Sequence, residues 1–285
     1  MSHTPLVLRT PREMQADSQK ARQQGLVIGL VPTMGALHPG HMSLVDYTRR
    51  RCDRLVVSIF VNPIQFNNPD DLAAYPRTWE QDIELCARAG VDVIYAPTPE
   101  VMYPEGFQTT VSLKRVTRGM EGDHRPGHFD GVSTVVLKLF NVVQPNLAAF
   151  GEKDYQQLRV VQCMVQDLDL PVEVVGLPTV REDGGLAMSS RNRHLSHQER
   201  QQALCLYRGL SRARDLAQAG ERQAAALVEA ARAEIQQESA VRLEYLEVFD
   251  AQSLEPVSRL EGPARMALAA QVGRTRLIDN LALNY

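Results

Sequence analysis

A continuous apolar run between a glycine and a proline is the feature that most constrains the fold. Residues 26–31 have the sequence Leu-Val-Ile-Gly-Leu-Val and lie between Gly25 and Pro32. A run without a polar residue on either face is typical of a strand covered on both sides, as in a parallel sheet. We therefore expect residues 26–31 to form the first strand of such a sheet.

Helical and apolar segments alternate on both sides of this run. Before it, Thr10, Pro11 and Glu13 form a helix-start signature for a helix that ends near Gln24. The order of segments predicts an α/β fold with a doubly wound, Rossmann-like parallel sheet and right-handed crossovers. The other expected elements are helices over 41–51, 78–89, 132–143 and 155–168, and strands over 55–61, 91–96, 146–150 and 172–180.

The sequence changes character near residue 182. A polar loop over 181–192 precedes two helical patterns, which are followed by a run of strands. Helices followed by strands indicate a smaller α+β domain, so we expect domains at 1–182 and 183–285. The expected elements are helices over 196–219 and 221–238, and strands from Val241 onward, over 265–270 and over 275–282. In the first of these strands, alternation places Leu243, Tyr245 and Glu247 on one face and Glu244, Leu246 and Val248 on the other.

Composition excludes several classes of protein. The chain has 285 residues, 44% hydrophobic and 23% charged, which is enough to bury a core without a metal or disulfide. The net charge of −3 gives no bulk positive field for a nucleic acid. The first 20 residues are polar and all apolar runs are far shorter than the ~18 residues of a membrane span, so we expect a soluble, cytoplasmic protein. The four cysteines are scattered and are expected to be free thiols, namely Cys52, Cys86, Cys163 and Cys205.

The first chemical motif directly follows the first predicted strand. Residues 31–41 have the sequence Val-Pro-Thr-Met-Gly-Ala-Leu-His-Pro-Gly-His, at the place where open α/β sheets bind ligands. The chain contains neither a P-loop nor a dinucleotide-binding glycine motif. Gly40 allows close approach of the backbone, and the imidazoles of His38 and His41 can donate to phosphate oxygens at a helix N-terminus. The alternative, two ordinary core or surface histidines, is disfavoured by this position.

A second motif, Gly-Glu-Lys-Asp-Tyr-Gln-Gln over 151–157, also follows a predicted strand and begins a helix. Lys153 is the only one of the four lysines at such a position, which makes it the best candidate for a point charge on phosphate. Asp154 is suited to accept hydrogen bonds from ribose hydroxyls. The alternative is a solvated helix start without function.

A third motif, Met-Ser-Ser-Arg-Asn over 188–192, lies at the predicted domain boundary. Its hydroxyls, backbone N–H groups and guanidinium suit a triphosphate whose charge shifts during a reaction. A flexible serine-containing linker is the alternative.

Together these motifs carry a family resemblance. The His-Pro-Gly-His and Met-Ser-Ser-Arg segments are similar to the paired ATP-binding signature of nucleotidylyltransferases and class I aminoacyl-tRNA synthetases. Within that superfamily, five segments resemble the pantoate–β-alanine ligase family in order and spacing, and the resemblance extends from about residue 5 to the C-terminus. The segments are 32–41, Phe-Val-Asn-Pro-Ile-Gln-Phe at 60–66, Arg-Pro-Gly-His-Phe-Asp-Gly-Val at 125–132, 151–157 and 189–192.

The resemblance implies an enzyme that condenses pantoate with β-alanine through a pantoyl adenylate and releases AMP and pyrophosphate. It implies ATP as a substrate, with Mg²⁺ bound mainly through its phosphates, a homodimer, and a second domain that closes over the active site. The implied catalytic residues are His41, His38, Lys153 and Arg191. Those implied to bind ATP are Met34, Gly35, Ala36, Leu37, His38, Pro39, Gly40, His41, Gly151, Glu152, Lys153, Asp154, Val180, Met188, Ser189, Ser190 and Arg191. Those implied to bind pantoate or β-alanine are Gln65, Gln157 and Asn62.

Three alternatives remain at this point. Some residues between 121 and 130 imitate a metal site, but nothing places them at tetrahedral spacing on fixed elements; they are Glu121, Asp123, His124, His128 and Asp130. A nucleotidylyltransferase acting on a phosphate ester would need extra cations in its acceptor site, where the implied pocket has two glutamines. A non-catalytic nucleotide-binding module would have no use for both motif histidines.

Overall fold

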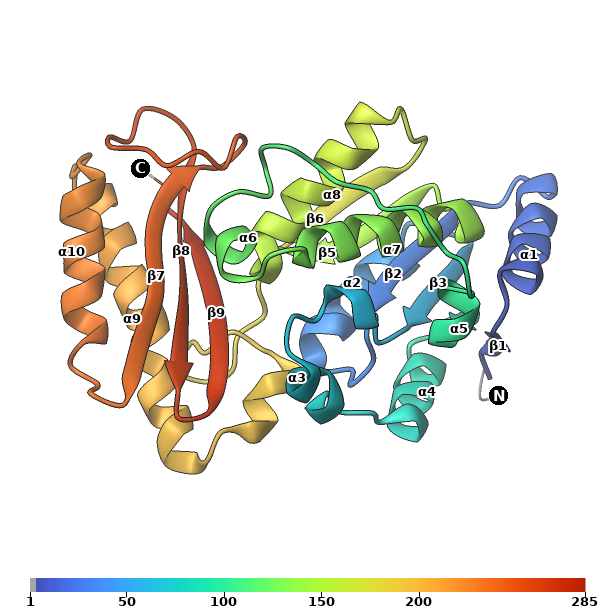
Figure 1. The fold of residues 1–285 in the computed structure, drawn as a ribbon, viewed down its shortest axis with the longest axis horizontal. Helices are drawn as coiled ribbons and strands as arrows, with labels where there is room; N and C mark the ends of the chain where they lie inside the picture. Colours follow the sequence, from blue (N-terminus) through green and yellow to red (C-terminus); the bar gives the residue numbers. More distant parts are fainter. Residues whose placement is uncertain (1–3, 285) are drawn as a thin grey trace. The chain divides into compact units, whose positions relative to one another are not determined.

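The computed structural model describes residues 4–284, which form two compact units (Figure 1). The first unit contains the chain up to Thr117 together with Glu121–Glu152 and Gln157–Pro178. The second unit contains the chain from Thr179 onward. Two short segments from earlier in the sequence, Arg118–Met120 and Lys153–Gln156, also belong to the second unit.

The first unit is built on a six-stranded sheet in which every pair of neighbouring strands is parallel. In spatial order the strands are β1 (Leu6–Leu8), β4 (Val93–Tyr95), β3 (Arg54–Ile59), β2 (Ile28–Thr33), β5 (Leu147–Gly151) and β6 (Glu173–Leu177). The helices are α1 (Pro11–Gln23), α2 (Pro39–Arg49), α3 (Pro69–Ala74), α4 (Trp79–Arg88), α5 (Pro99–Met102), α6 (Met120–His124), α7 (His128–Val143) and α8 (Tyr155–Asp167), with short 3₁₀ turns η1 (Pro63–Gln65) and η2 (Glu152–Asp154). The first residues of α6 and α8 and most of η2 lie in the segments that belong to the second unit. The expected doubly wound α/β fold is confirmed.

Both faces of the central strands are covered. Alternate residues of the strands, such as Val31, Val57 and Ile94, form one cluster with residues of α2 and α4, including Val45 and Cys86. Helices α1 and α7 contact each other and also β2. Because parallel crossovers are right-handed, the reversal of strand order between β4 and β5 places α7 on the face opposite α2. Burial on both faces explains why β2 lacks the polar alternation of a half-exposed strand.

The prediction that the run over 26–31 supplies the first strand is wrong. A three-residue strand, β1, precedes it and pairs in parallel with β4, with Leu6 opposite Val93. This strand lies at the edge of the sheet, and Leu6 is half exposed. A strand of this length shows no periodicity that sequence patterning can detect. The capping signature before α1 is confirmed, since Thr10 and Glu13 bond reciprocally.

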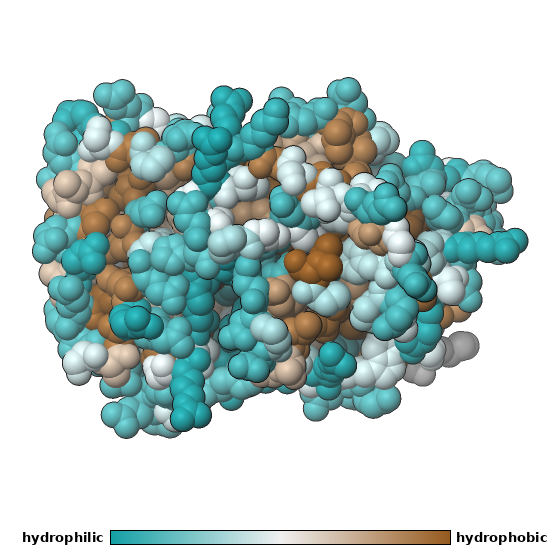
Figure 2. Space-filling view, in the orientation of Figure 1, coloured by the Kyte–Doolittle hydropathy of each residue, from teal (hydrophilic) through white to brown (hydrophobic). Residues whose placement is uncertain are grey.

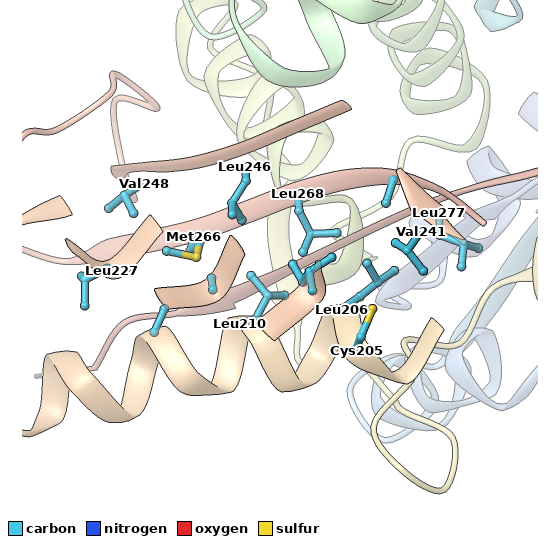
Figure 3. Packing of buried hydrophobic residues seen from close by; sticks show 14 of the residues in the cluster. Cys205, Leu206, Leu210, Leu227, Val241, Leu246, Val248, Met266, Leu268 and Leu277 are labelled. Atoms are coloured by element: carbon cyan, nitrogen blue, oxygen red, sulfur yellow. The ribbon is translucent and has the colours of Figure 1, made fainter. Parts of the chain in front are cut away.

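The second unit packs two helices against a three-stranded antiparallel sheet (Figure 3). Its elements are the 3₁₀ helix η3 (Ser190–His194), α9 (His197–Gln218), α10 (Ala224–Ile235), β7 (Val241–Asp250), β8 (Ala264–Val272) and β9 (Thr275–Ala282). Leu206 and Leu210 from α9 meet Leu268 from the central strand β8 and Leu227 from α10 in one buried cluster. This unit therefore has a hydrophobic core of its own.

The predicted alternation along β7 fails because the strand is irregular. Leu243 pairs with Ala270 and Tyr245 with Ala269, which leaves Glu244 as an extra residue in a bulge. Leu243 consequently packs on the helix-facing cluster with Leu246, whereas the alternation had placed it on the face of Tyr245. One inserted residue reverses the faces of all residues on one side of the bulge.

Hydrophilic side chains predominate on the face shown in Figure 2, with smaller hydrophobic areas between them. Within residues 4–284, the exposed large hydrophobic side chains are Leu6, Val27, Ile64 and Leu168. No helix in this part of the chain is both long and apolar enough to cross a membrane. The four cysteines are free, and burial raises the pKa of Cys52 to about 11 and of Cys86 to about 12.

Candidate functional site

The order of strands marks one edge of the first sheet as the place for a ligand. Strand β2 lies between β3 and β5. After β2 the chain forms β3 and β4 on one side of it, and it then crosses back to form β5 on the other side. In open α/β sheets this reversal opens a crevice at the carboxyl ends of the two strands. Residues 34–41 follow β2. Gly151 is the last residue of β5, and Glu152 comes directly after it. The first and second sequence motifs therefore begin at the two strand ends on either side of this reversal.

One buried carboxylate holds the loop that follows β2. Asp82 of α4 is 1% exposed and accepts hydrogen bonds from the backbone N–H groups of Ala36 (3.0 Å) and Leu37 (2.8 Å). It also accepts from Thr78 Oγ1 at 3.1 Å. Gly35 and Ala36 have φ values of 80° and 50°, a left-handed conformation that is unfavourable for alanine. The two bonds to Asp82 thus stabilise a strained loop in a single conformation.

The two motif histidines cap helix α2. His38 is the N-cap residue, and its Nδ1 accepts from Gly40 N at 3.1 Å. His41 Nδ1 in turn accepts from His38 N at 3.4 Å, and the two ring centroids lie 4.0 Å apart. A ring nitrogen that accepts an N–H bond carries no proton, so the neutral imidazoles carry theirs on Nε2. Both side chains are therefore neutral hydrogen-bond donors at a helix N-terminus, which favours anionic groups.

A second group of predicted residues meets at the turn after β3. Asn62 and Gln65 are buried, and Asn62 Nδ2 donates to Gln65 Oε1 at 2.9 Å. Gln65 Nε2 lies 3.2 Å from Met34 Sδ in the loop after β2. Asn62 Nδ2 also donates to Gly131 O at 3.1 Å, and Tyr103 donates its hydroxyl to Asn62 Oδ1 at 2.8 Å. The structure thus brings Met34, Asn62 and Gln65 into direct contact.

The Arg-Pro-Gly-His segment fixes the main chain of this turn. Arg125 NH2 donates to Gln65 O at 3.1 Å, and His128 Nδ1 lies 2.8 Å from the same oxygen. Glu121 lies 3.5 Å from Arg125 NH1, so the charged residues of this segment interact with one another. Within residues 4–284, no group of three or more His, Cys, Asp or Glu side chains is arranged to hold a metal ion. The contacts from Arg125 and His128 make the segment an anchor for the main chain at Gln65.

The segment after β5 is shared between the two units. Gln157, on the first turn of α8, is half-buried and belongs to the first unit. Lys153 belongs to the second unit, where its backbone oxygen accepts from Asn280 Nδ2 at 2.9 Å. Its ammonium lies 3.6 Å from the carboxylate of Asp154. Asn280 Oδ1 accepts from Arg265 Nε at 2.9 Å, so the main chain at Lys153 is fixed to the antiparallel sheet.

The loop that carries the third motif is a closed hairpin-like structure in the second unit. Met188 N donates to Val180 O at 2.9 Å, and Arg181 and Ala187 form an isolated bridge. Ser189 caps η3 by accepting from Arg191 N at 3.2 Å. Val180, Met188, Ser189, Ser190 and Arg191 are thus held in one ordered loop.

An ion pair in the second unit supports the base of this loop. Arg181 donates to both carboxylate oxygens of Asp279 at 2.6 and 3.0 Å, and its guanidinium stacks 4.2 Å from the ring centroid of Tyr207. Burial raises the pKa of Asp279, and Arg181 opposes this effect. The pair fixes the start of the loop, because Arg181 also donates to Gly185 O at 2.9 Å.

Sequence patterning missed Asp82 and Tyr103. In the sequence, Asp82 resembles a solvated residue of an acidic helix. The one signal against this is that Asp82 precedes the buried Cys86 by four residues, which places both on the same face of the helix. Tyr103 lies in an irregular segment without a motif, so nothing in the sequence links it to Asn62.

Comparisons with known proteins agree with this architecture. The family model for pantoate-beta-alanine ligase matches residues 6–282. A pantothenate synthetase from Heliobacterium modesticaldum is 50% identical over 277 residues, which cover 97% of this chain and 99% of the relative. One from Syntrophotalea carbinolica is 52% identical and covers 94% of each chain.

Solved structures give the same result. The pantothenate synthetase from Thermus thermophilus superposes with a TM-score of 0.93 at 45% identity, covering 98% of this chain and 100% of the other. The pantoate-beta-alanine ligase from Francisella tularensis, complexed with beta-gamma ATP and β-alanine, superposes with a TM-score of 0.82 at 34% identity and 98% coverage of each chain. From its sequence and its fold, this chain belongs to the pantoate–β-alanine ligase family and is a ligase of that kind.

Proposed function

We propose that this enzyme condenses pantoate with β-alanine in two half-reactions at one site. A carboxylate oxygen of pantoate attacks the α-phosphorus of ATP, which forms pantoyl adenylate and expels pyrophosphate. The amine of β-alanine then attacks the acyl carbon, loses a proton and expels AMP. A free carboxylate is a poor acyl donor because its leaving group would be oxide, and the mixed anhydride replaces oxide with AMP. The observation that best supports the proposal is the pair of capping histidines at the switch point of the sheet.

The histidines are suited to the first half-reaction. Negative charge builds on the phosphates as pyrophosphate leaves, and donors fixed in advance stabilise this charge without reorganising. His38 and His41 meet this requirement because each Nδ1 accepts a hydrogen bond from a backbone N–H group, which leaves the ring proton on Nε2. We assign both to the phosphates, with His41 as the principal donor. Asp82 supports them indirectly by holding the loop.

The other proposed ATP contacts are those implied by the family resemblance. They comprise backbone and side-chain groups of Met34–His41 and of Gly151–Asp154, Val180, and Met188–Arg191. Lys153 and Arg191 supply positive charge for the phosphates. We also propose that the second unit closes over bound ATP, since these two residues belong to that unit.

Gln65 and Gln157 are assigned to pantoate, with Gln65 also near β-alanine and Asn62 beside it. Carboxamides bind hydroxyl and carboxylate groups without adding charge. The contact of Asn62 with Gln65 supports placing them in one subsite. A transferase for phosphate esters would need cations here instead of two carboxamides.

Mg²⁺ is proposed to enter as part of the substrate, MgATP. Mg²⁺ is usually held by one or two carboxylates together with substrate phosphates. Glu152, which is half-buried, fits such a partial role, because Asp154, the other acidic residue of the ATP motifs, is assigned to the ribose hydroxyls. When bound, the ion would neutralise charge on the phosphates.

The proposal is tested by measuring AMP with pantoate and β-alanine supplied separately and together. We expect sustained AMP release only when both are present, in amounts equal to the pantothenate formed. Release of ADP would indicate phosphorylation at the γ-phosphate and contradict the proposal. ATP turnover without the small acid would also contradict it.

A homodimer stays a prediction from the family resemblance, and a cytoplasmic location stays a prediction from the polar N-terminal sequence and the short apolar runs. Light scattering at micromolar concentration should give twice the mass of one chain. A monomer under these conditions would refute the dimer.

A further inference from the structure

We infer that Tyr103 is a positioning residue that stabilises, through Asn62, the orientation in which the Gln65 carboxamide faces the substrate. This inference rests on the proposed function, in which Gln65 binds the acid substrates. The juxtaposition behind it is a chain of three hydrogen bonds at the turn after β3. No sequence motif or family assignment above includes Tyr103.

One backbone carbonyl fixes which atom donates and which accepts in these three hydrogen bonds. Gly131 O can only accept, so the Asn62 atom 3.1 Å from it must be the donor Nδ2. Asn62 Oδ1 is then the atom 2.8 Å from the Tyr103 hydroxyl, which must donate to it. The same Nδ2 also faces Gln65 at 2.9 Å, so the Gln65 atom at that point must be the acceptor Oε1. Each orientation therefore fixes the next.

The turn cannot adjust to a different orientation. A Cβ at Gly131 would lie 2.7 Å from Ile64 O and 2.8 Å from Gln65 N, so α7 contacts the main chain of η1 without space between them. Arg125 and His128 hold the backbone oxygen of Gln65 from the same side. With the main chain fixed, the bond from Asn62 restrains the rotation of the Gln65 carboxamide.

The Tyr103 hydroxyl is itself held in place. Its ring packs near the rings of Phe60 and Phe107, with centroid distances of 6.2 and 5.2 Å, and Lys138 Nζ lies 5.9 Å from its centroid. Burial raises the pKa of Tyr103 well above its ordinary value. The hydroxyl therefore keeps its proton and stays a donor to Asn62.

The consequence is a donor of fixed direction at the substrate. With Oε1 occupied by Asn62, Gln65 offers its Nε2 hydrogens, and within residues 4–284 their partner is Met34 Sδ, a weak acceptor. An N–H group in this position selects an oxygen acceptor, such as a carboxylate or hydroxyl of the acid. Through Asn62, the Tyr103 hydroxyl thus helps to keep an N–H donor of Gln65 toward the substrate, and this donor selects for a substrate oxygen.

The test replaces Tyr103 with Phe in the full-length enzyme and measures steady-state kinetics. Without the hydroxyl, Asn62 Oδ1 loses its partner and Asn62 is held less firmly against Gln65, so we expect KM for pantoate to rise by roughly 10-fold. KM for ATP should change by less than about twofold. Tyr95→Phe is the matched control, because Tyr95 is a buried tyrosine of the first unit whose hydroxyl donates to Met102 Sδ at 3.9 Å and has no role in the Asn62–Gln65 contact. This control should leave both KM values unchanged.

A double-mutant comparison separates positioning from general damage. In a Gln65→Ala background, Tyr103→Phe should add less than about twofold, because the carboxamide it orients is gone. Equal effects of Tyr103→Phe with and without Gln65, or a parallel rise in KM for ATP, would overturn the inference. So would an unchanged KM for pantoate in Tyr103→Phe.

A further variant tests the direction of the chain without touching Tyr103. Gln65→Glu keeps an oxygen toward Asn62 but replaces the N–H donor with an oxygen and adds a negative charge, so KM for pantoate should rise at least 10-fold. This measurement decides the matter if Tyr103→Phe does not fold, and a KM within twofold of wild type would overturn the inference. If instead the wild-type enzyme makes no pantothenate, the proposed function has failed, which is a distinguishable result.

Discussion

Replacing Asp82 with Ala should destabilise the first unit strongly, although Asp82 belongs to none of the sequence motifs. The substitution leaves the N–H groups of Ala36 and Leu37 without partners, and both residues are at most 3% exposed. Each buried donor without a partner costs about 1–3 kcal/mol, so the free energy of unfolding should fall by about 2–6 kcal/mol. Asp82→Asn should lower the free energy of unfolding nearly as much, because its amide nitrogen would face one of these two backbone N–H donors.

Urea denaturation followed by circular dichroism measures this effect. The slope of the unfolding free energy against urea concentration should be the same in variant and wild type, which checks that both expose the same surface on unfolding. Asp46→Ala is the control, since Asp46 forms an exposed ion pair with Arg50 and should cost less than about 1 kcal/mol. The loop held by Asp82 carries His38, so kcat should also fall, by about 10²-fold. If Asp82→Ala unfolds within 1 kcal/mol of wild type and keeps its kcat, the argument that Asp82 holds the loop is refuted.

Three further predictions concern catalysis, recognition and acid stability. His41→Ala should lower kcat by roughly 10²–10⁴ while ATP affinity stays within a few-fold, and near-normal turnover would remove His41 from the mechanism. Gln157→Ala should weaken pantoate binding by about 1–3 kcal/mol, measured by calorimetry, and an equal loss for ATP would instead indicate a structural role. Hydrogen bonds to Thr10 and Ser196 lower the pKa of Glu13 and Glu199 from 4.5, so their stabilisation is complete above that pH and is lost as pH falls through the lowered values. Tm below pH 4.5 should therefore fall less steeply in a double Glu→Gln variant than in wild type, and identical slopes would contradict this.

The alternating pattern of the first unit could be predicted because each of its central strands is buried on both faces. Capping signals also predicted helix starts well, as at Thr10 before α1. What failed was structure determined by partners distant in the sequence. Strand β1 is defined by its pairing with β4, and the bulge at Glu244 by its pairing with β8. Neither partner is visible in the local sequence.

The candidate site divides in the same way. The positions of His38 and Gly40 follow from the end of a buried strand, which sequence patterning could find. That the histidine side chains cap their own helix, and so carry their protons on Nε2, needed the structure. Asp82 and Tyr103 act on loops 46 and 41 residues away in the chain, and such contacts leave no periodic signal. The membership of Lys153 in the second unit is likewise a non-local property.

Pantoyl adenylate is proposed to form before β-alanine is needed, and isotope exchange can detect this order. Labelled pyrophosphate should enter ATP when enzyme, Mg²⁺, ATP and pantoate are present and the amine is absent, because the first half-reaction is reversible within the site. Omitting pantoate should abolish the exchange, and Lys153→Ala should slow it together with the overall reaction. Exchange that appears only after β-alanine is added would contradict the adenylate intermediate and the phosphate roles assigned to His38, His41 and Lys153.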